Sequence, residues 1–126
     1  MFTKNSENLN FTYIGDGKCV LSGRGACKDD ILIVPATYNG NSVIAVDAGA
    51  FKNDLTIKGI ILPGSVVTIR NNAFYGCALL EVFSGIGVKR VDEQAFRGCT
   101  GVRCFATGIL NEIGTGAFFD ANIYWL

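Results

Sequence analysis

The sequence predicts a β-rich, right-handed solenoid of about four coils, each a turn of 22–23 residues, behind an N-terminal β-hairpin cap. Three observations predict this fold. The dipeptide Ala-Phe recurs at residues 50–51, 73–74, 95–96 and 117–118. Glycine, present 16 times, occurs in every interval between these pairs, so tight turns are frequent. Hydrophobic residues make up 49% of the 126 residues and charged residues 17%, so the chain can bury a core and is not disordered.

Other positions repeat in step with the Ala-Phe pair. The residues four before each Ala are Val46, Ile69, Val91 and Ile113, and the residues seven before it are Val43, Val66, Val88 and Leu110. The residues three after each Phe are Asp54, Cys77, Cys99 and Ala121. A unit of about 22 residues is too small to bury its own apolar side, so the units must stack on one another.

Short strands explain each repeat better than one long helix, because glycine costs about 1 kcal/mol inside a helix and β-branched residues are frequent. The expected main strands are Gly59–Leu62, Val82–Gly85 and Cys104–Thr107. The expected second extended pieces are Val66–Ile69, Val88–Val91 and Leu110–Ile113. A helical or 3-10 turn is expected to carry each Ala-Phe pair. The phenylalanines at positions 51, 74 and 96 are expected to form one stacked aromatic column.

Residues 1–42 differ from the repeats and predict an N-terminal cap. Phe11–Ile14 and Cys19–Leu21 alternate around a glycine-containing turn, as the strands of a hairpin do. Ile31–Val34 followed by Pro35 is similar to the strand and proline of the first repeat. We therefore expect one continuous domain, with a cap at 1–42 and repeats at 43–65, 66–87, 88–109 and, incomplete, 110–126.

The repeat resembles the BspA-type leucine-rich repeat. The segments that carry the resemblance are Val66-Val67-Thr68-Ile69, Asn72-Ala73-Phe74-Tyr75-Gly76-Cys77 and Leu80-Glu81-Val82-Phe83. The proline of the family pattern is present only in the first repeat, as Pro63, and its glycine only at Gly114. The resemblance implies a non-enzymatic, adhesion-type module that binds a protein. It also implies a secreted or cell-surface location, although the first residues lack the apolar segment of a signal peptide, which leaves a cytoplasmic location open.

Composition argues against several classes of function. Eleven basic and eleven acidic residues give no net charge, and a nucleic-acid-binding protein would carry a basic excess. The longest aliphatic run, Ile31–Val34, is far shorter than the roughly 20 residues of a membrane span, so no membrane insertion is expected. Histidine is absent, which removes the commonest catalytic base and metal ligand. We expect no enzyme, no cofactor and no metal site.

The five cysteines are expected to be mainly structural. Cys77 and Cys99 share one repeat position, and their parallel side chains are poorly oriented for a disulfide. Cys19 and Cys27 are the pair that a disulfide in the cap would join, and the sequence leaves that bond open. Cys104 is expected on the outer face of a main strand.

The outer face of the main strands is the candidate site for a protein partner. In leucine-rich repeats, the residues between the buried positions of the main strand are exposed, and here those columns include Gly59 and Ile33. The residues that we expect to bind are Lys58, Ile61, Glu81, Val82, Ser84, Arg103, Cys104 and Ala106. The alternative is a structural or self-assembling spacer with no external ligand.

The last repeat predicts a second surface. It ends in a run of apolar and aromatic residues where a terminal repeat would normally be polar. We expect a homodimer through this end of the solenoid, formed by Phe119, Ile123, Tyr124, Trp125 and Leu126.

Overall fold

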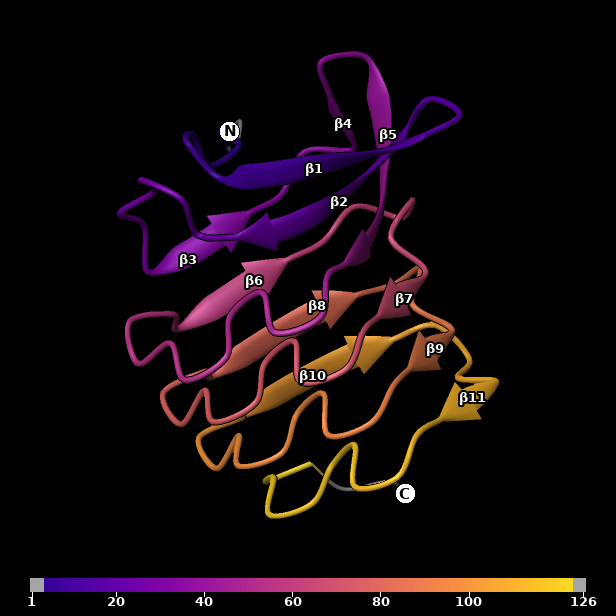
Figure 1. Cartoon of the computed structure of the whole chain (residues 1–126). Helices are drawn as coiled ribbons and strands as arrows, with labels where there is room; N and C mark the ends of the chain where they lie inside the picture. The colour runs from indigo at the N-terminus through magenta and orange to yellow at the C-terminus, as the bar shows by residue number, and fades with distance from the viewer. Residues whose placement is uncertain (1–3, 124–126) are drawn as a thin grey trace.

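Two sheets run side by side along the stacked coils in the computed structural model, which describes residues 4–123 (Figure 1). The four-stranded sheet is parallel, with the order β10-β8-β6-β3. The seven-stranded sheet has the order β1-β2-β5-β7-β9-β11, and β4 pairs with β5. The cap strands are β1 (Asn10–Gly15), β2 (Lys18–Gly23), β3 (Ile31–Ile33) and β4 (Thr37–Tyr38), and β5 (Asn41–Val46) runs from the cap into the first repeat. The repeat strands are β6 (Gly59–Ile61), β7 (Thr68–Ile69), β8 (Val82–Gly85), β9 (Arg90–Val91), β10 (Cys104–Thr107) and β11 (Glu112–Ile113).

The predicted solenoid is confirmed, and its main strands lie where the sequence places them, to within one residue. The second extended pieces are shorter than expected, because only the last two residues of each predicted piece pair as β7, β9 and β11. The predicted hairpin is also confirmed, since β1 and β2 pair antiparallel. Asp16 and Gly17 at its turn both have positive φ, of 53° and 71°, as a two-residue hairpin turn requires.

The segments that carry Ala-Phe are turns, and residues 4–123 contain no helix. Two positions in every repeat have left-handed backbone, with φ between 55° and 78°. The residue before each Ala is Gly49, Asn72, Gln94 or Gly116, and the second residue after each Phe is Asn53, Gly76, Gly98 or Asp120. A left-handed residue on both sides of the pair prevents a helix from continuing, so the expected helical turns reduce to single hydrogen-bonded turns.

The core lies between the two sheets and the turns. Its aromatic column is confirmed: Phe51 and Phe74 stack with ring centroids 5.4 Å apart, and Phe74 and Phe96 with centroids 5.2 Å apart. Phe118 extends the stack at 5.7 Å from Phe96. Phe83, from β8, contacts the column edge-on, at 4.9 Å from Phe96. One continuous apolar core therefore runs along the coils.

The two repeat cysteines are hydrogen-bonded within this core. The Cys77 thiol donates to the carbonyl oxygen of Phe51 at 3.0 Å, and the Cys99 thiol to that of Phe74 at 3.1 Å. Burial raises the pKa of the Cys99 thiol to about 12, and it raises the pKa of Cys77 further. Neither group is a thiolate at neutral pH, which agrees with a structural role.

Thiol reagents are expected to modify Cys104 alone in the native protein. Cys104 is exposed, whereas Cys19, Cys27, Cys77 and Cys99 are buried, and none of the five is in a disulfide. Mass spectrometry should find one label on the native protein and five after unfolding. Rapid labelling of Cys77 before unfolding would contradict the arrangement.

The cap closes the first coil through two sets of polar contacts. The Ser6 amide donates to the carbonyl oxygen of Ile33 at 2.8 Å, and the Ser6 hydroxyl accepts from the Ile33 amide at 2.9 Å, so the free edge of β3 is covered. The Arg24 side chain donates to the Asp54 carboxylate of coil one (residues 43–65) at 3.0 Å. Arg24 also donates to the carbonyl oxygens of Cys27, at 3.1 Å, and Asp29, at 2.7 Å.

The stability that Asp54 contributes is expected to fall in acid. Burial by itself would raise the pKa of Asp54, but hydrogen bonds from Thr56 and the Arg24 guanidinium outweigh it and hold the pKa below its usual value. A carboxyl with a lowered folded-state pKa stabilises the fold above its unfolded pKa, of about 4, and loses this contribution as the pH falls through the folded pKa. Denaturant melts measure the free energy of unfolding of wild type and of Asp54→Asn. The difference between these two free energies should be constant near neutral pH and should become smaller below about pH 4. A free-energy difference that does not depend on pH would contradict the lowered pKa of Asp54.

Candidate protein-interaction surface

The register of the four-stranded sheet aligns the outward-facing residues of its strands in two columns. We call the outer surface of β3, β6, β8 and β10, with the residue before each strand, the strand face. The first column consists of Ile31, Gly59, Val82 and Cys104, and the second of Ile33, Ile61, Ser84 and Ala106. Seven of the eight residues expected to bind are exposed: Lys58, Ile61, Glu81, Val82, Arg103, Cys104 and Ala106. The eighth, Ser84, is half-buried.

The first column differs from the expectation at Gly59, which is buried. A β-carbon built on Gly59 would lie 3.4 Å from the Ile31 side chain and 3.7 Å from that of Val82. These two neighbours cover the glycine, so the column presents Ile31 and Val82 and no gap between them. Ile31 is 54% exposed and was not in the expected set, although it lies on the strand that the sequence analysis matched to the first repeat.

A row of alternating charges borders the strand face, one from the residue before each main strand. Lys58 lies 4.0 Å from the Asp30 carboxylate, and Arg103 lies 4.0 Å from that of Glu81. Lys58, Glu81 and Arg103 were among the residues expected to bind, whereas Asp30 was not in the expected set. Its position before Ile31, like that of Lys58 before Gly59, was the available signal. Exposed ion pairs of this kind contribute about 0–1 kcal/mol each to the stability of the fold. Because so little stability depends on them, these side chains can rearrange to contact a partner.

The turns carry a second row, which sequence reasoning missed. The residue after each Ala-Phe pair is alternately a cation and an aromatic residue: Lys52, Tyr75, Arg97 and Phe119. The Lys52 ammonium lies 5.2 Å from the centroid of the Tyr75 ring. The Arg97 guanidinium lies 5.9 Å from the Tyr75 ring and 4.9 Å from that of Phe119. Cation–π contacts at these distances link each turn to the next.

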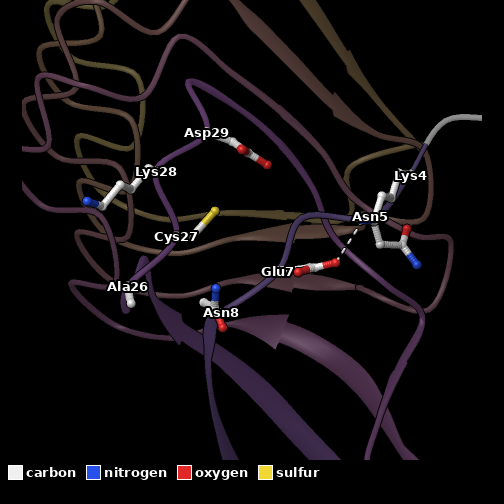
Figure 2. Close-up of a pocket in the computed structure, with 8 residues that line it drawn as sticks. All are labelled: Lys4, Asn5, Glu7, Asn8, Ala26, Cys27, Lys28 and Asp29. Carbon is white, nitrogen blue, oxygen red and sulfur yellow. Dashed lines mark ion pairs between the residues drawn. The ribbon is translucent and has the colours of Figure 1, made fainter.

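A pocket of about 460 Å³ lies between the N-terminal segment and the loop after β2 (Figure 2). Lys4 and Glu7 form an ion pair of 3.0 Å at its rim, and Lys28 and Asp29 place further charges of both signs around it. The Cys27 side chain lies in the floor and is buried. This mixture selects neither an anion nor a cation. Within the described part of the chain, no three His, Cys, Asp or Glu side chains come together as a metal site would need.

The residues expected to self-associate are only partly described. Phe119 is 61% exposed, whereas Ile123 is half-buried and packs against the core. Tyr124, Trp125 and Leu126 lie outside the described residues. No helix within residues 4–123 has the length and apolar character that crossing a bilayer needs.

Comparison with known proteins supports the architecture. The BspA type leucine rich repeat region matches residues 35–125 in six copies. A leucine-rich repeat protein from Bacteroides ovatus is similar, with 23% identity and a TM-score of 0.76 over 96% of this chain and 33% of its own. The T. pallidum leucine-rich repeat protein is also similar, with 22% identity and a TM-score of 0.77 over 93% of this chain and 66% of its own.

A leucine-rich repeat protein from Bacteroides capillosus has a TM-score of 0.67 and 20% identity, over 86% of this chain and 94% of its own. At these identities the likeness establishes the fold alone. The chain spans a third of the length of the Bacteroides ovatus structure. No curated protein matches the chain.

Proposed function

Because the chain belongs to the family of BspA-type leucine-rich repeat proteins, we propose that it is a protein-interaction module that binds its partner through the strand face. The family consists of repeat scaffolds, and the surface carries any activity. The proposal includes an adhesion-type role in a secreted or cell-surface protein, supported by family membership alone.

One observation carries the proposal: the strand face joins exposed apolar side chains to a border of paired charges. Ile31, Ile61 and Val82 are 54%, 40% and 37% exposed and come from three neighbouring strands. Apolar residues that are contiguous on a rigid sheet and rimmed by charged residues are typical of protein-binding surfaces. The acid–base pairs along the border supply orientation rather than net attraction, because their charges cancel.

Charge reversal on the border is expected to weaken partner binding at least tenfold. The test variant is Lys58→Glu with Glu81→Lys and Arg103→Glu. The matched control is Lys89→Glu with Arg90→Glu and Glu112→Lys, which changes the net charge equally but at β9, the residue before it, and β11 of the seven-stranded sheet. A photoactivatable crosslinker on the exposed Cys104 thiol first captures the partner from extracellular protein, and surface plasmon resonance then compares both variants with wild type. Equal binding by test and control variants would contradict a role of the strand face.

The second candidate function is a self-assembling spacer, favoured by the exposure of Phe119 in the last turn. In this case the chain forms a homodimer through Phe119 and Ile123–Leu126, and no partner is captured at Cys104. Light scattering across concentration separates the two functions. A monomer at high micromolar concentration, unchanged by Tyr124→Ser with Trp125→Ser, argues against the spacer.

A further inference from the structure

The turns of neighbouring coils are joined by backbone hydrogen bonds at the row of cations and aromatic rings. We call the four residues that follow the Ala-Phe pairs the turn row: Lys52, Tyr75, Arg97 and Phe119. The amide after each row member donates to the carbonyl oxygen of the next one: Asn53 to Tyr75 at 2.6 Å, Gly76 to Arg97 at 2.7 Å and Gly98 to Phe119 at 3.0 Å. These bonds fix the spacing of the row, so a partner meets a preformed surface.

Arg97 has surroundings unlike those of the other arginines. Its guanidinium lies 5.9 Å from the centroid of the Tyr75 ring and 4.9 Å from that of Phe119. Each other arginine forms an ion pair with a carboxylate: Arg24 with Asp54, Arg70 with Asp47, Arg90 with Asp92 and Arg103 with Glu81.

The donors of Arg97 are unused within the molecule. Among residues 4–123, the Arg97 side chain pairs with no carboxylate and donates no hydrogen bond, and it is only half-buried. A guanidinium that lies against aromatic rings keeps its planar fork of N–H groups for a carboxylate, which it binds through two parallel hydrogen bonds. The two rings therefore position Arg97 for an external anion.

Lys52 supplies a second positive charge on the same row. It is exposed, its ammonium lies 5.2 Å from the Tyr75 ring, and no carboxylate in the described part of the chain pairs with it. The acids closest to the row in sequence are Asp54, which Arg24 neutralises, and Asp120, which follows the last row member. Neighbouring strands lie about 4.8 Å apart, so Lys52 and Arg97, two coils from each other, present their charges about 10 Å apart.

This spacing indicates the conformation of an acidic partner. A polyproline II segment has three residues per turn and rises about 3.1 Å per residue, so residues i and i+3 lie on one side and about 9 Å apart. In a β-strand these two residues point to opposite faces, and in an α-helix they are only about 5 Å apart along the axis.

The backbone of the turns also favours this conformation over an added β-strand. The amides of all four row members are bonded within their own turns, to the carbonyl oxygens of Gly49, Asn72, Gln94 and Gly116. The carbonyl oxygens of Tyr75, Arg97 and Phe119 accept from the preceding coil. A strand would find no free amide to pair with, whereas a polyproline II segment binds through its side chains.

We propose that the turn row binds an acidic segment of a partner protein in the polyproline II conformation, with two acidic residues three positions apart. One carboxylate accepts two hydrogen bonds from the Arg97 guanidinium, and the other pairs with the Lys52 ammonium. Tyr75, on the intervening coil, contacts the residues between them. The site goes beyond the proposed function, because it lies on the turns and shares no residue with the strand face.

The probe is a fluorescein-labelled peptide of sequence Pro-Pro-Glu-Pro-Pro-Glu-Pro-Pro, titrated with the full chain at low salt and followed by anisotropy. Its prolines hold the polyproline II conformation. Saturable binding with a Kd below about 1 mM is expected. The matched peptide Pro-Pro-Pro-Glu-Glu-Pro-Pro-Pro has the same composition and charge, but its carboxylates cannot reach both cations, so it should bind about threefold more weakly.

Substitutions in the chain test the two contacts separately. Arg97→Gln should weaken binding of the first peptide about tenfold, because it removes charge-assisted hydrogen bonds. Lys52→Gln should weaken it about threefold and should leave binding of the adjacent-glutamate peptide unchanged. Lys89→Gln is the control, because Lys89 is also exposed and without an ion pair among residues 4–123 but lies before β9, and it should bind as wild type does. Circular dichroism melts verify that each variant folds.

Three results would overturn the proposal. The first is no saturable binding at about 2 mM of the chain. The second is equal binding of the two peptides, or equal weakening by Arg97→Gln and Lys89→Gln, because net charge alone would then attract the peptide. The third is a sulfated oligosaccharide that binds at Arg97 and Lys52 when the peptide does not, which would make the turn row a site for an acidic glycan.

Discussion

Replacing Phe74 by alanine is expected to lower the free energy of unfolding by about 3–5 kcal/mol. Phe74 is fully buried and lies in the middle of the aromatic column. It stacks on Phe51 and Phe96 at interplanar angles of 10° and 6°, and Phe83 meets it edge-on at 78°. Removal of the ring takes away these contacts and leaves a cavity between rigid coils that cannot collapse to fill it.

This loss is a large share of the 5–15 kcal/mol that is the free energy of unfolding of an ordinary domain. Phe74→Ala should therefore unfold at a much lower denaturant concentration than wild type. Urea melts followed by circular dichroism measure it. Phe119→Ala is the matched control, because Phe119 is also aromatic and follows an Ala-Phe pair but is 61% exposed. This variant should lower the free energy of unfolding by less than about 1 kcal/mol. A loss of less than 1 kcal/mol for Phe74→Ala would show that the column does not hold the coils together.

Arg24→Ala is expected to lower the free energy of unfolding by about 1.5–3 kcal/mol, the range for hydrogen bonds to charged groups. The side chains of Arg24 and Asp54 are 21% and 15% exposed, so their charges are largely removed from water. Without the guanidinium, the Asp54 carboxylate and the carbonyl oxygens of Cys27 and Asp29 lose a donor. The cap would then be joined less firmly to coil one.

Lys58→Ala is the matched control for this variant. Lys58 also pairs with an acid from the cap, Asp30, but both side chains are more than half exposed and 4.0 Å apart. Its loss should change stability by less than about 0.5 kcal/mol. Hydrogen exchange should also show faster exchange in the loop of residues 24–30 for Arg24→Ala alone. Equal stability of the two variants would mean that the ion pair of Arg24 with Asp54 contributes no more to the free energy of unfolding than the exposed pair of Lys58 with Asp30.

The periodic part of the molecule could be predicted from the sequence. A repeat that recurs at 22–23 residues specifies one coil at a time, and apolar positions such as those of Val46, Ile69 and Val91 are buried in each of the first three coils. For this reason the main strands, the aromatic column and the buried pair Cys77 and Cys99 were predicted. These features depend on local pattern and on neighbours at a fixed distance along the chain.

Contacts that break the period could not be predicted in the same way. β2 of the cap pairs in parallel with β5, and this pairing joins the cap to the repeats. The Arg24 side chain contacts Asp54, which lies 30 residues further along the chain. The contacts of β2 and of Arg24 join segments with no common spacing, so no periodic signal marks them. Gly59 is different: Ile31 lies in register with it on β3, and only the packing of side chains shows that Ile31 covers the glycine.

The sequence by itself determined the coil, because a small repeated unit can bury its apolar side only against copies of itself. The tertiary structure alone decided which surface residues meet. Lys58 pairs with Asp30 only because stacking of the coils sets the register of the strands. The contacts between cations and aromatic rings, from Lys52 to Phe119, depend in the same way on the register of the turns. An isolated repeat contains one member of each row, and the interaction exists only between coils.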